Sequence, residues 1–131
     1  MNSPDSDDFK PYQIKFEHRS DYLYAYVSGE QDSLAISLGF WREIAAECQR
    51  AQARKVLIEE DIEESVSMVE MYQIAAEIPK MGFTGALIAF VDRFLEQQDI
   101  NRFGELVANN RGLRGKIFND VREAEKWLRE N

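Results

Sequence analysis

The sequence contains one cysteine and one histidine in 131 residues. Cys48 cannot form an internal disulfide, which is typical of proteins from a reducing cytoplasm. It lies in an apolar stripe with helical spacing, so we expect a small buried side chain rather than a reactive thiol. His18 stands alone in a predicted turn and is expected at the surface. Neither residue points to a chemical reaction.

Basic residues are outnumbered by acidic ones. The chain has 16 Lys and Arg against 24 Asp and Glu, and its net charge is -8. Binding to nucleic acid requires clustered Lys and Arg, so we expect no nucleic-acid partner. No apolar run approaches the roughly 18 residues of a membrane helix, and residues 1–8 hold no apolar export segment. The composition therefore predicts a cytoplasmic protein that does not insert into membranes.

Signatures of catalysis and of cofactor binding are also missing from the sequence. It has no glycine-rich phosphate loop, CxxC pair, HExxH or GxSxG motif. Carboxylates are plentiful, but their spacing selects no pair for general acid–base work. We therefore expect a protein that is not an enzyme and that needs no cofactor.

The residues that are present predict one α/β domain. Residues 1–8 read as a disordered acidic tail, because they carry three Asp and no apolar area, and the domain is expected over residues 9–131. Apolar side chains alternate with polar ones in some segments and recur at helical spacing in others. Strands are predicted over residues 12–17, 22–27, 55–58, 85–91 and 113–118, and helices over residues 34–48, 68–78, 100–107 and 121–128.

The order of these segments specifies the topology. The first two strands are joined by a short turn and predict an antiparallel hairpin. Each later strand follows a helix, which predicts three right-handed crossover units with parallel strands. The expected fold is a single five-stranded mixed sheet with helices. Gly39, inside the first helix, is expected where another element approaches closely.

Three segments near the end of the chain carry a family resemblance: FGELVANNRG at residues 103–112, KIF at 116–118 and EAEKWL at 123–128. They resemble the C-terminal part of small bacterial STAS-like proteins, relatives of the anti-sigma-factor antagonists that are also similar to CRAL-TRIO-type folds. The resemblance implies a STAS-like fold and a regulatory or protein-interaction role without catalysis. The similarity to CRAL-TRIO folds implies an alternative, a carrier or sensor of a small apolar or lipid-like ligand.

In antagonist STAS domains, a serine before the second helix is phosphorylated and switches partner binding. Ser65 occupies this stretch here and is the candidate phosphorylation site, although no glycine follows the serines as in the family's Asp-Ser-Ser-Gly pattern. Ser67 and Glu70 have the spacing of a capping box, which predicts a structural role for Ser67 at the start of the helix.

Two sets of residues are candidates for a partner surface. The acidic run comprises Glu59, Glu60, Asp61, Glu63 and Glu64, together with Ser65. It follows a predicted parallel strand, where α/β proteins often bind ligands. Its alternatives are a solvated loop, a protein-docking surface and a metal site.

The second set is Tyr22, Tyr24 and Tyr26, which share one face of the second strand. These tyrosines suit packing against the sheet, a homodimer or partner contact, or the floor of a site for an apolar ligand. An unidentified protein partner is the principal expectation.

Overall fold

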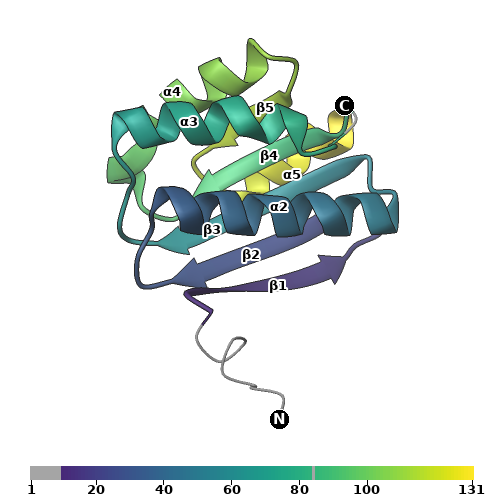
Figure 1. Ribbon diagram of the computed structural model, residues 1–131. Helices are drawn as coiled ribbons and strands as arrows, with labels where there is room; N and C mark the ends of the chain where they lie inside the picture. The colour runs from purple at the N-terminus through teal and green to yellow at the C-terminus, as the bar shows by residue number, and fades with distance from the viewer. Residues whose placement is uncertain (1–9, 84) are drawn as a thin grey trace.

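The computed structural model describes residues 10–83 and 85–131, and the predicted tail at residues 1–8 lies outside these ranges. Its centre is one five-stranded sheet with the spatial order β1-β2-β3-β4-β5 (Figure 1). The first pair of strands is antiparallel and the remaining pairs are parallel. The strands are β1 (Tyr12–His18), β2 (Leu23–Gly29), β3 (Lys55–Ile62), β4 (Leu87–Asp92) and β5 (Arg114–Phe118).

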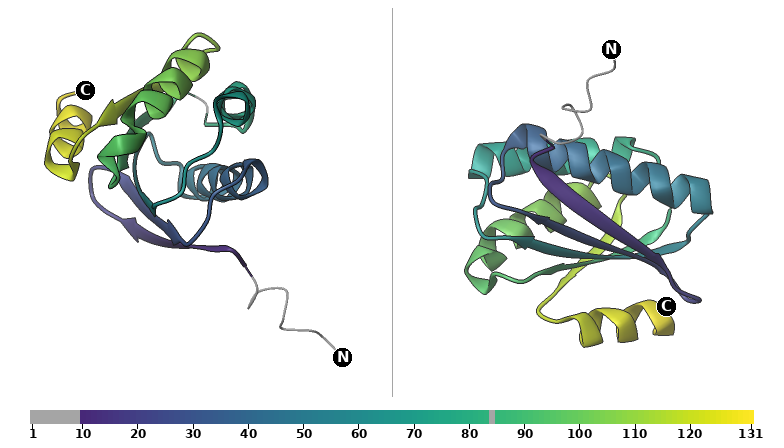
Figure 2. Two further views of the ribbon diagram at one scale, coloured as in Figure 1. Left: turned by 90° about the vertical axis from the view of Figure 1, so that its left-hand side faces the viewer. Right: turned by 90° about the horizontal axis from the view of Figure 1, so that it is seen from below.

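Within the described ranges, four α-helices cover the two faces of this sheet unequally. Helices α2 (Leu34–Ala51), α3 (Met68–Glu77) and α4 (Gln98–Asn109) belong to the three crossovers and lie on one face. Helix α5 (Val121–Glu130) lies alone on the other face, against β3, β4 and β5 (Figure 2). The predicted α/β fold with an N-terminal hairpin and three crossover units is confirmed.

Local sequence signals explain where the helices begin. The Ser33 hydroxyl accepts a hydrogen bond from the Ile36 amide at the start of α2. Ser67 and Glu70 form the predicted capping box at the start of α3, each side chain accepting from the other residue's backbone amide. Such caps satisfy amides that have no partner within the first helical turn.

The largest core cluster lies between the sheet and the three crossover helices, and the core side chains of β2, β3 and β4 there are almost fully buried. Cys48 belongs to this cluster, as predicted, and burial raises the pKa of its thiol. Gly39 also has the predicted close neighbour, because a Cβ atom there would lie 3.0 Å from the Tyr12 hydroxyl. These contacts hold α2 tightly against β1 and β2.

Several predicted boundaries differ from the observed ones, and the largest difference is at the end of β3. The third strand was expected to end at Ile58, which placed the acidic run in a loop, but β3 continues to Ile62. Paired strands on both sides explain the extension, since Glu59 lies opposite Tyr26 of β2 and Val91 of β4. Backbone pairing with two neighbours therefore outweighs the polar character of residues 59–61.

Candidate functional site

Extending β3 through the acidic run sends its carboxylates to opposite faces of the sheet, because successive strand side chains alternate. Glu59 and Asp61 lie on the face that carries α5, and Glu60 lies on the face covered by the crossover helices. Glu63 and Glu64 follow the strand and are exposed. The acidic residues therefore lie in three different environments, the α5 face, the crossover-helix face and the exposed segment after β3, and do not form one acidic surface.

On the α5 face, the two candidate sets of residues meet. The Tyr24 hydroxyl donates a hydrogen bond to Glu59, and the Tyr26 hydroxyl donates one to Asp61. Arg93 lies beside both carboxylates, with N···O distances of 3.7 Å to Glu59 and 3.4 Å to Asp61. We call these five residues the tyrosine–carboxylate network. The role of Arg93 in this network was not predicted, because it follows β4 in the sequence and is far from β2 along the chain.

The tyrosines differ in their surroundings. Tyr22 is 4% exposed, packs beneath α5, and donates a hydrogen bond to Glu125. Tyr24 and Tyr26 are half-buried, and the Arg19 guanidinium lies 4.2 Å from the centre of the Tyr24 ring. Burial and then the hydrogen bond to Glu59 raise the pKa of Tyr24. Tyr22 therefore belongs to the core, and the accessible tyrosines are Tyr24 and Tyr26.

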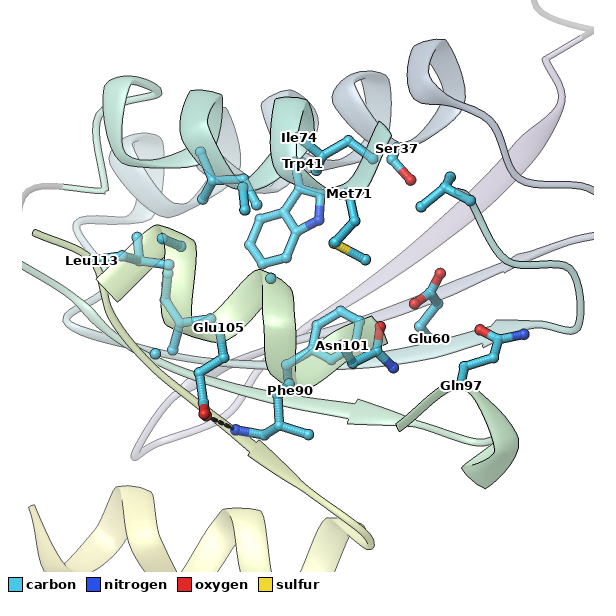
Figure 3. Close-up of a pocket in the computed structure, with 18 of the residues that line it drawn as sticks. Ser37, Trp41, Glu60, Met71, Ile74, Phe90, Gln97, Asn101, Glu105 and Leu113 are labelled. Carbon is cyan, nitrogen blue, oxygen red and sulfur yellow. Dashed lines mark hydrogen bonds between the residues drawn. The ribbon is translucent and has the colours of Figure 1, made fainter. Parts of the chain in front are cut away.

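On the opposite face, a cavity of about 80 Å³ lies between the sheet and helices α2, α3 and α4 (Figure 3). Its walls are largely apolar. Trp41 stacks on Phe90 with ring centres 5.9 Å apart, and Phe40 stacks on Trp41. The further apolar lining includes Val66, Met71, Ile74, Ile78, Ile88 and Leu113.

Glu60 lies in the lining of this apolar cavity. Its side chain projects from β3 towards the space below Met71, and the residue is only 4% exposed (Figure 3). Within residues 10–83 and 85–131 its carboxylate has no hydrogen-bond partner and no ion pair. The pKa of Glu60 is raised well above 4.5, first by burial and then by the negative charges of Asp92 and Asp32.

Those two neighbours are carboxylates with hydrogen bonds of their own. Asp92 accepts from the Asn101 side chain and from the Phe94 amide, both at 2.8 Å. Asp32 accepts from the Ser37 hydroxyl at 2.7 Å and from the Ser33 amide at 2.8 Å. Burial raises the pKa of each, and the hydrogen bonds oppose that rise.

Glu60, Asp32 and Asp92 come from strand β3 and from the loops or strand ends beside it. They gather at the carboxyl ends of the parallel strands, where α/β sheets place ligand sites. Glu60 was a predicted site residue, but its burial was not predicted. The sequence did contain a sign of this burial, because Glu60 occupies a position in the alternating series whose other members, Val56, Ile58 and Ile62, are apolar and buried.

A metal centre finds no support at this position. Within the described part of the chain, no group of three or more His, Cys, Asp or Glu side chains is arranged to hold a metal ion. Asp92 and Asp32 already accept hydrogen bonds from protein donors.

The segment between β3 and α3 borders the cavity. Ser65 and Val66 contribute to its lining, and the Gln97 side chain donates to the backbone carbonyl of Glu63. Glu64 accepts a hydrogen bond from the Asp32 amide at 3.2 Å. The Ser65 side chain is exposed, so the candidate phosphorylation site lies at the surface beside the cavity.

Exposed large apolar side chains are concentrated on one side of the molecule. Among the described residues they all belong to α3, to α4 or to the short helix η2 (Leu95–Gln97). Val69, at the start of α3, is 69% exposed. Helices α3 and α4 pack against each other, and Arg111 joins them by donating a hydrogen bond to the Tyr72 hydroxyl at 2.9 Å. We define the α3–α4 surface as Met68, Val69, Tyr72 and Leu106.

No family model matches the chain, and no curated protein is significantly similar to it in sequence. Several chains of solved structures resemble it in fold, including the following two. One is an uncharacterised DUF3478-family protein with a SpoIIAA-like fold from Shewanella loihica PV-4, with 18% identity over 89% of this chain and 93% of that one, and a TM-score of 0.54. The other is the protein TM1081, with 16% identity over 91% and 90% of the two chains and a TM-score of 0.51.

These likenesses concern the fold alone. They agree with the STAS-like topology that the element order and the C-terminal segments predicted. In the described ranges, no helix is both long and apolar enough to cross a membrane. The chain has a SpoIIAA-like α/β fold.

Proposed function

We propose that this chain is a non-catalytic regulatory domain that binds a protein partner in the cytoplasm. The observation that carries the proposal is the α3–α4 surface. Large apolar side chains left in water contribute nothing to stability, so several of them on two helices that pack together favour an interaction site. Binding rather than catalysis is proposed because the prominent features are an apolar surface and an apolar cavity.

The surroundings of this surface indicate the chemistry of the partner. Glu63, Glu64 and Ser65 lie immediately before α3 and are exposed. A partner that places apolar side chains on the α3–α4 surface and basic ones beside this acidic segment would complement both. A phosphate on Ser65 would add negative charge at the edge of the same contact and would alter its electrostatic fit.

The experiment compares three tagged proteins in lysate of the source organism. The double variant Met68→Lys/Val69→Lys places charge on the α3–α4 surface, and Arg122→Ala/Lys126→Ala alters two exposed residues of α5 as a control. We expect the wild type and the control to retain the same protein and the Met68/Val69 variant to lose it. Equal retention by all three proteins would contradict the proposed surface.

A homodimer is a separate possibility for the other face of the sheet. Helix α5 covers β3, β4 and β5 but makes no substantial contact with β2 or β1, and Tyr24 and Tyr26 of β2 stay half-exposed. A second copy packed there would make an isologous contact. Light scattering after size exclusion would show a dimer that the variant Tyr26→Asp reduces to a monomer.

The cavity supports a second candidate function, a carrier or sensor of a small ligand. An apolar pocket with a few convergent polar groups is the usual form of a small-molecule site. Glu60, Ser37 and Asn101 supply such groups here. Native mass spectrometry of gently purified protein tests this candidate, because a retained ligand adds mass to the folded protein.

A further inference from the structure

The chemistry of the cavity specifies what kind of ligand it can take, if the second candidate function holds. Glu60 supplies a buried carboxyl group that no described basic side chain neutralises and no described residue hydrogen-bonds. Its raised pKa means that it holds a proton in the ligand-free protein, and a bound cation would displace that proton. None of the three carboxylates, Glu60, Asp32 and Asp92, lies within ion-pair distance of a described Lys, Arg or His. An apolar site with unneutralised carboxylates favours a cation over a neutral or anionic ligand.

Nearby basic residues are engaged elsewhere. Arg93 follows Asp92 but lies beside Glu59 and Asp61 on the α5 face. Lys116 belongs to the cavity lining, but its ammonium group lies 5.5 Å from the centre of the Phe118 ring, which packs against Trp127 of α5. Neither of these side chains therefore compensates the charge of ionised Glu60, and a cationic ligand could do so.

The walls favour an organic cation over a hydrated metal ion. Phe40, Trp41 and Phe90 line the same space, and their apolar surfaces suit the carbon atoms of an organic ligand. A hard metal ion would need several oxygen ligands, and no such group is arranged here among the described residues.

The size of the cavity limits the ligand. A volume of about 80 Å³ has room for about five water-sized groups, taking roughly 15 Å³ for each. We infer that this cavity binds a small organic ammonium ion, a primary or methylated amine on a short apolar chain, with its nitrogen at the Glu60 carboxylate and its carbons against Trp41 and Phe90.

The test uses three probes of similar size and different charge: butylammonium, butanol and butyrate. Each is titrated at a fixed, mildly alkaline pH into isotopically labelled protein, and amide chemical shifts report binding. The variant Glu60→Gln keeps the shape of the side chain and removes its charge. Glu59→Gln is the matched control, because the neighbouring carboxylate faces the other side of the sheet.

We expect butylammonium to shift amides around the cavity and to bind at least about tenfold more tightly than butanol, since a charge-assisted hydrogen bond is lost with the alcohol. Butyrate should not bind. Glu60→Gln should weaken butylammonium binding by a similar factor while its spectrum stays that of a folded protein, and Glu59→Gln should bind as the wild type does.

Other results would overturn the inference in distinguishable ways. Equal binding of butanol and butylammonium would support a site for apolar ligands but would contradict the inference that the ligand is an ammonium ion. The same shifts with sodium or magnesium chloride would assign the site to an inorganic cation. If no probe moves the cavity amides, both the ammonium class and the small-ligand function fail.

Discussion

Replacing Glu60 by Gln should stabilise the protein, and by an amount that increases with pH. Glu60 is 4% exposed and has no partner among the described residues, so its ionised form is penalised only in the folded state. Gln has almost the same shape and carries no charge. The substitution therefore removes a penalty without opening a cavity.

The pH dependence follows from the raised pKa of Glu60. Below the ordinary value of 4.5, the carboxyl is protonated in both folded and unfolded protein and makes no difference to stability. Above it, the unfolded chain releases the proton while the folded protein retains it, so folding stability decreases as pH rises. The decrease is about 1.4 kcal/mol for each pH unit until the folded-state pKa is passed.

Urea unfolding of the wild type and of Glu60→Gln, from mildly acidic to mildly alkaline pH, measures this difference. We expect the two proteins to be similarly stable at the acidic end and to diverge steadily as pH rises. Glu59→Gln is the control and should be less stable by about 1 kcal/mol, because it disturbs the hydrogen bond from Tyr24. A Glu60→Gln protein that is less stable than the wild type, or a difference that does not change with pH, would refute the reasoning.

Three further outcomes are expected in the same unfolding assay. Ser67→Ala should lose about 1 kcal/mol, because it removes the N-cap of α3, whereas Ser65→Ala should change little; equal effects would contradict the different roles of the two serines. Gly104→Ala should change stability by no more than about 1 kcal/mol, because the shift of Met71 that a Cβ atom 2.6 Å from its sulfur requires is offset by the gain of replacing a helical glycine; a loss of about 3 kcal/mol would show that Met71 cannot move aside. Trp41→Ala should lose about 3–5 kcal/mol, because the ring is buried against three aromatic neighbours; a much smaller loss would mean that the cavity closes around the gap.

The sequence was sufficient for the topology and for several local features. Periodic apolar residues located all five strands and the four α-helices, because period two and helical spacing are properties of short segments. The capping box at Ser67 and the close approach at Gly39 were also predicted, since each depends on a few neighbouring residues or on one missing side chain.

The structure of the acidic run was predicted less well, because it depends on strand pairing between distant parts of the chain. A strand can hold polar residues when paired strands on both sides fix its backbone, and the neighbours of β3 come from distant parts of the chain. Reading residues 59–64 as a loop ignored that pairing. The two halves of the tyrosine–carboxylate network were both named, but their contact depends on the same pairing.

The sequence by itself determined the order of strands and helices, the acidic charge and the isolation of Cys48, because each follows from residue type and spacing. Only the tertiary structure decided that Glu59 and Glu60 face opposite sides of the sheet, and that Glu60 meets Trp41, Phe90 and the carboxylates of Asp32 and Asp92. These groups are far apart along the chain, and burial acts on a charge only after the fold has brought them together.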